Sequence, residues 1–508
     1  MSRTARMTFG AALILSTIAL VSANSASASG PSGVLTVGIE GAGTSLNPAV
    51  DVAAGDQLVM QALPYESLIH YATNGTPSPG LATSWGYVGT GNTTFQLTLR
   101  PNMEFSDGSP VNSAAVATWL EYYMKTSSNA GSIGTITSID TPSPTSVVIH
   151  LGTANPEMPY YLSDQFTAGA VVSPQAIANP SSLGNSTDGA GPYMLEASET
   201  VANSTYTFVP NPNYYDPSQI RFSQVVVKII TSPSSMLEAA VTGQVDVAYG
   251  DSTTVNAAVK DGLQVASGPI GTSVVQFADF VGKLTPAFGK IKVRQAMNYA
   301  LNRKAIAEGL VGKYGAPTSE MVTPDGYDPA YKNYYNYDPS KARALLKAAG
   351  YPHGFTTKVV VPAELGTGGV PFTLAVAKYL GAVGIKVKIT SEATQAEFVK
   401  VGLNGTFPLL VAPWTEGILS LYNTCWAPKA IINFFHAHLP EINTLDAQAT
   451  VAANPAKYLK LMTDIATKDA FELPVYEEDG LWYASKNIGG LAVSVAAPEP
   501  VATDFYLK

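Results

Sequence analysis

The stretch from Ile291 to Gly312 reads IKVRQAMNYALNRKAIAEGLVG, and it says more about the fold than any other part of this 508-residue chain. Its apolar residues recur at the spacing of one face of an α-helix. They are Val293, Ala296, Met297 and Ala300. The stretch therefore predicts an amphipathic helix at the surface of the protein.

A second helix is predicted in the tract YNYDPSKARALLKAAGYPHGF, from Tyr335 to Phe355. Asp338 can cap the first turn, and Pro339 suits the first helical position. Gly350, followed closely by Pro352, supplies the stop signal. The tract predicts a short helix enclosed by both signals.

The N-terminal half alternates between strand and helix patterns. Val34–Ile39 and Val147–Leu151 read as strands, and Phe95–Leu99 alternates apolar with polar residues, which is the period of a half-buried strand. Val116 and Trp119 begin a helical stripe. Such mixed runs are typical of an α+β lobe.

A βαβ unit is predicted further along the chain. It consists of a strand at Lys358–Val361, a helix at about Phe372–Val383 and a strand at Ile385–Ile389. This order implies a parallel pair with a right-handed crossover. Ligands of such sheets sit beyond the carboxyl ends of the strands, here near Pro362–Gly369 and Thr390.

The string VRQAMNYALNRKAIAEGL resembles the VRxAxxxAxDR helix of the family 5 solute-binding proteins of ABC importers, which include oligopeptide, dipeptide and nickel binders. Further stretches carry the likeness in the family's order. They are TSLNPA (Thr44–Ala49), FQLTLRPNMEFSDGSPVNSAAV (Phe95–Val116), GAGPYML (Gly189–Leu195), VPNPNYYDP (Val209–Pro217), LEAAVTGQVDVAYG (Leu237–Gly250) and DAFELPVYEEDGLW (Asp469–Trp482). A single chance motif would not produce this order.

The resemblance implies a mixed α/β fold with two lobes and a hinge, similar to periplasmic binding proteins, in which the first lobe carries an inserted subdomain. The chain would cross between the lobes near Gly282 and near Ser485. The expected ranges are 1–28 for a signal peptide, 29–56, 186–281 and 485–508 for lobe I, 57–185 for the subdomain, and 282–484 for lobe II.

The first residues read as a secretory signal peptide. Arg3 and Arg6 precede an apolar run from Met7 to Ala23, and small residues at 26–28 suggest cleavage after Ala28. An uncleaved anchor is the alternative. The expected location is extracytoplasmic, in the periplasm or at the cell exterior.

Removal of residues 1–28 leaves 27 basic and 38 acidic side chains, a formal charge of −11. This acidity argues against nucleic acid or an anionic membrane surface as a partner. The sole cysteine, Cys425, lies far from the signal segment, so a lipid-anchored cysteine after that segment is not expected. A single cysteine also excludes an intrachain disulfide, and we expect it to be buried.

Ligand contacts are expected first in the stretch from Phe407 to Trp426. In the family that the chain resembles, an apolar strand ending in Trp leads into an acidic loop whose Asp can hold the α-amino group of a peptide. Trp414 stands at the matching position, but Thr415 and Glu416 replace the usual Asp-Pro, with Tyr422 further on. Glu416 could take the place of the Asp, or it could be an exposed loop residue.

Two other segments are implied by the resemblance as walls of the same cleft. Thr44, Ser45 and Leu46 form the turn after the first strand, and Gln276 and Phe277 lie in the strand before the first crossing. All five residues could equally be ordinary turn and strand residues.

His436 and His438 could share one face of an extended segment and bind a transition metal together with Glu441. Solvated or capping histidines are the simpler interpretation, so no metal site and no cofactor are predicted. The chain has no HExxH and no GxSxG motif. We therefore expect a protein that is not an enzyme and has no catalytic residues.

The predicted function is capture of an oligopeptide-like solute by hinge closure and its delivery to the permease subunits of an ABC importer. The expected partners are that solute and those subunits, without nucleic acid, and the protein is expected to be a monomer. The alternatives are an oligosaccharide, a metal chelate such as nickel, or a ligand-sensing receptor module on the same fold.

Overall fold

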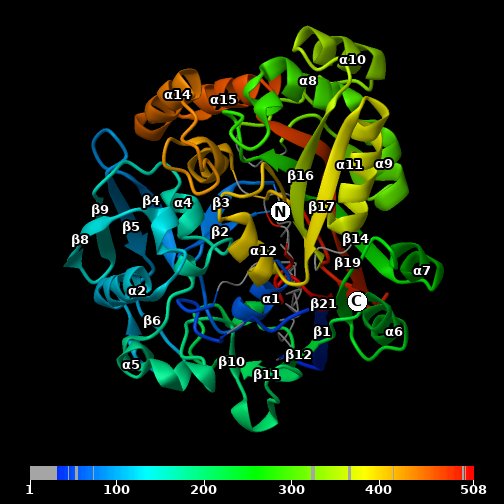
Figure 1. The fold of residues 1–508 in the computed structure, drawn as a ribbon. Helices are drawn as coiled ribbons and strands as arrows, with labels where there is room; N and C mark the ends of the chain where they lie inside the picture. Colours follow the sequence, from blue (N-terminus) through cyan, green and yellow to red (C-terminus); the bar gives the residue numbers. More distant parts are fainter. Residues whose placement is uncertain are drawn as a thin grey trace, which may run out of the picture.

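The structure is a computed structural model that describes residues 31–508, apart from residues 44, 52–54, 73, 322–325, 364–367, 416, 495, 496 and 498. Most of its strands form one large mixed sheet in the order β10-β11-β12-β1-β13-β19-β14-β18-β16-β17, with β15 also paired to β19 (Figure 1). Among the described residues, no helix has both the length and the apolar composition needed to cross a membrane.

One half of the sheet is built around β1 (Val34–Ile39), which is parallel to β12 (Gln224–Ile229) and β13 (Val247–Tyr249). Antiparallel strands β11 (Thr205–Pro210) and β10 (Tyr193–Leu195) extend it. The predicted first strand is confirmed, and its Leu35, Val37 and Ile39 are fully buried in a shared core. We call this half, with its helices, lobe I.

The other half contains the predicted βαβ unit. Strands β16 (Phe355–Pro362) and β17 (Ile385–Glu392) are parallel, and α11 (Val370–Ala382) connects them. Strand β18 (Leu409–Val411) is parallel to β16 on its other side. We call this half lobe II.

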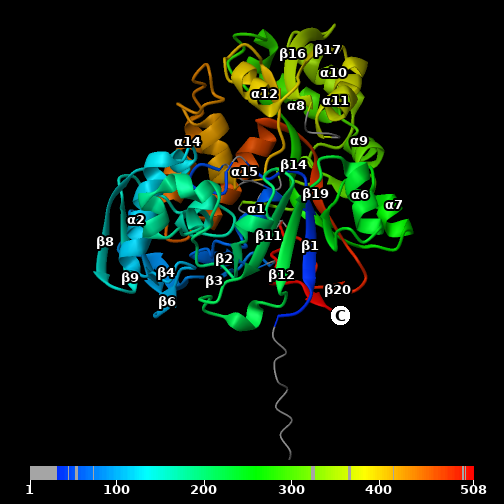
Figure 2. The same ribbon diagram turned by 90° about the horizontal axis from the view of Figure 1, so that it is seen from below.

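Two long antiparallel strands belong to both lobes (Figure 2). They are β14 (Gln264–Phe277) and β19 (Glu472–Ala484). Strand β13 of lobe I pairs with one end of β19, and β18 of lobe II pairs with the far end of β14. This pairing connects the strands of lobe I to those of lobe II through β14 and β19. The crossing points near Gly282 and Ser485 stay a prediction.

A separate four-stranded sheet lies on the lobe I side, drawn in blue and cyan in Figure 1. Its strands are β4 (Ala82–Tyr87), β5 (Thr94–Leu99), β9 (Ser146–Leu151) and β8 (Ile136–Ser143). Helix α2 (Ser113–Thr126) buries Trp119 and Tyr123 against it, as its apolar stripe predicted. The residues of this core fall between Ala49 and Ala190. The insertion at 57–185 stays a prediction.

The stretch Ile291–Gly312 forms two consecutive helices, α8 (Ile291–Ala300) and α9 (Arg303–Leu310). The break occurs because the Asn302 side chain accepts a hydrogen bond from the Ala305 N–H at 3.1 Å and begins a new helix. Helix α10 (Pro339–Ala348) starts and stops as predicted. Asp338 accepts from the Lys341 N–H at 2.8 Å, and Gly350 has φ +87°.

Two arginines of the stretch Ile291–Gly312 stabilise the fold through hydrogen bonds. Arg294 and Arg303 are buried, and each guanidinium donates to main-chain carbonyls of neighbouring segments. The acceptors of Arg294 are Phe288, Asp469 and Ala470, and those of Arg303 include Asn298, Tyr335 and Pro474. Arg294 therefore ties α8 to the segment just before β19, and Arg303 ties α9 to β19 itself.

Helices α14 (Pro440–Val451) and α15 (Ala456–Lys468) pack side by side in lobe II (Figure 1). Helix α15 buries Leu459 and Met462 in the core of lobe II, which also contains Cys425. The expectation that this cysteine is buried is confirmed.

Candidate functional site

Loops from both lobes meet the middle of the two shared strands. After β13, the Gly250 N–H donates to the Leu481 carbonyl of β19 at 2.7 Å. After β18, Trp414 and Thr272 of β14 exchange two backbone hydrogen bonds, of 2.8 and 3.0 Å. The carboxyl ends of the parallel strands in both lobes are thus brought to β14 and β19, where ligands of α/β sheets bind.

Tyr249 and Trp482 are the aromatic residues on one face of this region. They are opposite each other in the β13–β19 register, and their rings meet edge to face at 5.3 Å. Side chains alternate along a strand, so Glu478 lies on the same face of β19 as Trp482. The Ser273 hydroxyl of β14 donates to the Glu478 carboxylate at 3.0 Å.

Three more carboxylates act on Tyr249, besides that of Glu478. Glu40 follows β1 directly, and its N–H donates to the Asp56 carboxylate. Glu499 comes from the C-terminal segment. Burial raises the pKa of the Tyr249 hydroxyl well above its ordinary value, and the negative charges of Glu499, Asp56, Glu40 and Glu478 raise it further. All four carboxylates therefore act on one aromatic residue, and we call them the carboxylate cluster.

The cluster is poorly compensated by positive charge. Burial, followed by the charges of Asp56 and Asp251, raises the pKa of Glu40 to about 7, although this side chain is partly exposed. Burial raises the pKa of Asp56 to about 6 against the opposing effect of backbone N–H donors. Burial and Asp56 raise the pKa of Glu499 well above its ordinary value. The ion pairs formed by the described residues include none of the four carboxylates.

Trp414 and Thr415 of the predicted site lie against β14, while Glu416 falls outside the described residues. The Trp414 side chain is half-buried against the lobe II core, and its Nε1–H finds no acceptor within the described chain. Thr415 is exposed. A Cβ atom added at Gly271 would lie 2.9 Å from the Thr415 methyl and 2.4 Å from the Trp414 carbonyl, so only glycine allows this close approach.

Ser45 and Leu46 lie in lobe I, and Thr44 is outside the described residues. The Ser45 hydroxyl accepts from the Asn47 N–H at 3.0 Å, and Leu46 is buried with its carbonyl accepting from the Tyr65 hydroxyl at 2.9 Å. Both residues line a cavity of about 290 Å³ that is also lined by Tyr206 and by Gly184 and Asn185.

The structure places Gln276, Phe277 and Tyr422 inside lobe II. Phe277 is fully buried, with its ring 5.1 Å from that of Phe288. Gln276 is buried opposite Glu472 of β19. Tyr422 is buried with its hydroxyl donating to Asn443 at 3.0 Å, and burial raises its pKa to about 12. Hydrophobic packing explains Phe277 and Tyr422 without a ligand.

The carboxylate cluster and its two aromatic residues were not predicted as a site. Tyr249, Glu478 and Trp482 occur in stretches that carry the family resemblance, and Glu40 directly follows the first strand. The position of Glu40 at a strand's carboxyl end was the one available signal. Glu499 is distant in sequence from all of them, so no spacing could connect it to the site.

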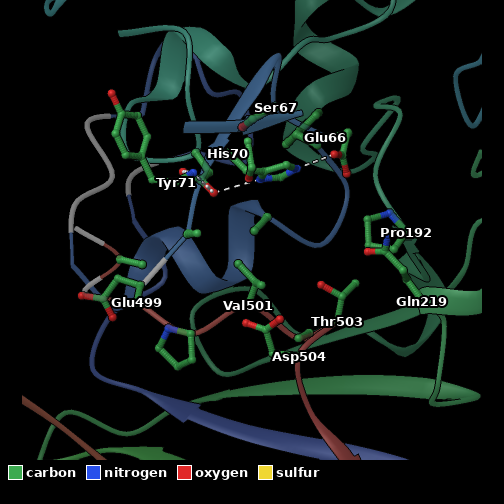
Figure 3. A pocket seen from close by; sticks show the side chains of 18 of the residues that line it. Glu66, Ser67, His70, Tyr71, Pro192, Gln219, Glu499, Val501, Thr503 and Asp504 are labelled. Carbon is green, nitrogen blue, oxygen red and sulfur yellow. Dashed lines mark hydrogen bonds and ion pairs between the residues drawn. The ribbon is translucent and has the colours of Figure 1, made fainter. Parts of the chain in front are cut away.

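A cavity of about 370 Å³ lies between the region of residues 62–78 and the C-terminal segment, and Glu499 of the carboxylate cluster lines it (Figure 3). In it, the His70 ring is held between two carboxylates, with Nε2 2.6 Å from Glu66 and Nδ1 2.9 Å from Asp164. These charges and hydrogen bonds raise the pKa of His70 well above its ordinary value, in spite of burial. None of its lining residues comes from lobe II, so closure of lobe II would not enclose this cavity.

The histidines considered for a metal are not gathered into a ligand set. His436 and His438 are exposed, and Nδ1 of His436 is 2.9 Å from the Pro428 carbonyl. The described residues contain no group of three or more His, Cys, Asp or Glu side chains placed to hold a metal ion.

Two lobes joined by two long strands, with loops of both lobes meeting at the joint, define the class of two-lobe periplasmic binding proteins. Solved structures confirm this fold. The ABC transporter-associated periplasmic binding protein DppA from Helicobacter pylori, in complex with the peptide STSA, has a TM-score of 0.74 and 21% identity, covering 94% of this chain and 98% of the other. The binding protein AgaA in complex with agropinic acid, from A. tumefacien R10, has a TM-score of 0.76 and 22% identity, covering 94% and 99%.

The sequence comparison identifies the family. The profile described as bacterial extracellular solute-binding proteins, family 5 Middle, matches residues 76–428. The glutathione-binding protein GsiB of Escherichia coli (strain K12) is 26% identical over 507 residues, which cover 90% of this chain and 95% of the relative. The chain belongs to the family 5 solute-binding proteins, which serve ABC importers. The predicted family, fold class and general function are confirmed.

Proposed function

We propose that this protein captures a small peptide-like solute between its lobes, outside the cytoplasm, and delivers it as a monomer to the permease of an ABC importer. One observation supports this most strongly. Loops from the carboxyl ends of strands in both lobes reach the middle of β14 and β19, next to the Tyr249 and Trp482 pair. A solute bound there would contact both lobes and favour the closed arrangement, because only a difference in affinity shifts such an equilibrium.

The peptide-like character is supported by the relatives. GsiB is named for binding glutathione, which is itself a tripeptide, and the DppA structure contains a peptide. Export rests on the signal-peptide pattern of residues 1–28, which lie outside the described residues.

Mass spectrometry of the purified mature protein tests this proposal directly. The protein is weighed under native conditions and again after denaturation, and the released molecules are identified. A released peptide mixture or a single small peptide is the expected result. A sugar, an opine or a nickel chelate would contradict the peptide assignment while leaving the family unchanged. If the protein is empty, thermal unfolding is measured with a peptide, a sugar, an opine and a nickel chelate in turn. The ligand that binds is the one that raises the melting temperature.

Trp414 provides a test of the lobe II wall. Replacement of Trp414 by Ala is expected to weaken solute binding about ten-fold or more, because a large aromatic anchor would be lost. The measurement is isothermal titration calorimetry with the solute identified above. Trp85→Ala serves as the control, because Trp85 is a half-buried tryptophan of β4, away from both lobes' shared strands. Unchanged affinity in a folded Trp414→Ala variant would exclude this residue from the site.

A further inference from the structure

We infer that the Asn92 side chain is a latch, which holds lobe II against the four-stranded sheet even when no solute is bound. Asn92 lies in the loop between β4 and β5. Its side-chain amide donates to the main-chain carbonyls of Thr450 at 2.8 Å and Ala452 at 3.0 Å, both at the end of α14 in lobe II. The inference goes beyond the proposed function, since this contact does not involve the solute.

The two acceptors are carbonyls that their own helix leaves unpaired. The last four carbonyls of an α-helix have no donor within the helix. Helix α14 ends at Val451, and Ala452 after it is extended, with ψ 140°. The chain therefore turns away instead of supplying the next helical N–H groups. A side-chain amide carries two hydrogens, which suffice for both carbonyls. A residue of the four-stranded sheet's loop thus completes a helix of lobe II.

The Asn92 residue is held firmly on its own side of the contact. Its carbonyl accepts from the Asn155 N–H at 3.0 Å, and the Asn155 side chain donates in turn to the Ile133 carbonyl at 2.9 Å. The φ angle of Asn92 is +49°, a conformation that asparagine adopts more readily than most residues. The backbone therefore fixes the direction in which this side chain points.

Burial distinguishes Asn92 from the rest of its loop. Thr90 and Thr93 are exposed, as is usual for a loop between two strands, whereas Asn92 is only 6% exposed. In both ribbon views α14 lies beside the four-stranded sheet (Figures 1 and 2). The one buried polar residue of the loop is thus the one that reaches lobe II.

Movement of the lobes must make or break this contact. The donor is fixed to the four-stranded sheet and both acceptors belong to α14, so moving lobe II away from the sheet separates them. Water then replaces Asn92 at the carbonyls, which keeps the net strength of the two bonds modest. Such a contact favours the arrangement with the lobes together but still allows them to separate.

The latch acts on solute affinity from outside the site. Its elements, the β4–β5 loop and α14, are different from the shared strands β14 and β19 where loops of both lobes meet. A protein that already populates its binding-competent arrangement binds its ligand more tightly. Asn92 therefore raises the affinity for any solute that binds with the lobes together.

Distances between two spin labels test the inference on the full mature chain, after any bound solute has been removed. Double electron–electron resonance is measured with labels at Ser138→Cys on β8 and Lys378→Cys on α11, two exposed positions on opposite sides of the contact. The native Cys425 is fully buried and so stays unlabelled. The unchanged latch should give a main population at the distance of the structure.

Two substitutions remove the donor in different ways. Asn92→Gly deletes the amide and still permits a positive φ, whereas Asn92→Asp keeps the shape but offers the carbonyls only acceptor oxygens. The ratio of closed to open populations is expected to fall about ten-fold in Asn92→Gly, and at least as much in Asn92→Asp.

Asn102→Gly is the matched control. Asn102 also has a positive φ, +58°, and it is exposed just before β6 (Met103–Glu104) in the same part of the chain. The control should leave the distance distribution unchanged, because Asn102 takes no part in the contact with α14.

The outcomes bear on the latch alone. Identical distance distributions for Asn92→Gly and the unchanged protein would overturn it, as would an equal shift in Asn102→Gly. If both Asn92 variants failed to fold while Asn102→Gly folded, Asn92 would be needed for the fold itself, and the latch would again be overturned. No solute is used, so peptide capture is decided separately, by the mass spectrometry described above.

Discussion

Arg303, one of the two buried arginines in the stretch Ile291–Gly312, shows how a single residue supports the fold. Arg303 donates to the carbonyls of Pro474 at 2.8 Å, Asn298 at 2.9 Å and Tyr335 at 3.0 Å. Burial lowers its pKa to about 9, which remains well above neutral pH, so the group stays charged. The planar guanidinium reaches three separate segments at once, and an ammonium cannot reproduce this geometry.

We therefore expect Arg303→Lys to lower the free energy of unfolding by about 3 kcal/mol, because buried carbonyls would lose their donors. Urea unfolding followed by circular dichroism measures this. Arg343→Lys is the matched control, since Arg343 is exposed on α10. A loss in Arg303→Lys no larger than that in the control would contradict the structural role.

The carboxylate cluster makes a prediction about pH at the same scale. The folded-state pKa of Glu40 is about 7, above its ordinary value of 4.5, so folding favours the protonated form. Such a group stabilises the protein at low pH, and its contribution is lost as the pH rises through about 7. Ligand-free protein should therefore melt at a falling temperature across this range. Glu40→Gln should flatten the fall, measured by thermal unfolding from about pH 4.5 to about pH 8.

Glu238→Gln provides the comparison for that experiment, because the substitution removes an exposed carboxylate outside the cluster. Its melting curve against pH should follow the curve of the unchanged protein. Parallel curves for all three proteins would show that Glu40 does not titrate in this range.

At the scale of elements, local signals predicted the helices and strands well. The cap at Asp338, the stop at Gly350 and the alternation of Phe95–Leu99 act within a few residues, so the sequence alone could show them. The break between α8 and α9 was missed because the apolar periodicity continues past Ala300, whereas the cap at Asn302 interrupts the helix.

The Asp338 cap gives a test at this scale. Asp338→Ala is expected to lower the free energy of unfolding by about 1 kcal/mol, because the Lys341 N–H would lose its acceptor. Asp338→Asn keeps an accepting oxygen and should cost less. Urea unfolding of both variants measures the two decreases in the free energy of unfolding. Equal decreases would indicate that the charge of Asp338 matters more than its capping hydrogen bond.

At the scale of the whole molecule, β14 and β19 are the structural link between the lobes. Relative movement of the lobes must bend or twist these strands, because β19 pairs with β13 of lobe I, β14 pairs with β18 of lobe II, and the two strands pair with each other. A solute held between the lobes would restrict that movement.

Small-angle X-ray scattering can detect the closure. A compact chain of this length has a radius of gyration of about 23 Å. Ligand-free protein is expected to show a larger radius than protein saturated with the solute identified by mass spectrometry. A solute that does not bind is the control, and an unchanged radius at saturation would contradict closure.

The sequence by itself determined the family, the two-lobe class and most individual elements of this protein, because caps, periodicity and ordered motifs are local properties of the chain. Only the tertiary structure decided the candidate site. It brings Glu40, Tyr249, Glu478 and Glu499 together from four distant segments, and it packs Phe277 into the lobe II core. Strand pairing and burial decide these outcomes, since both depend on contacts between residues far apart in sequence.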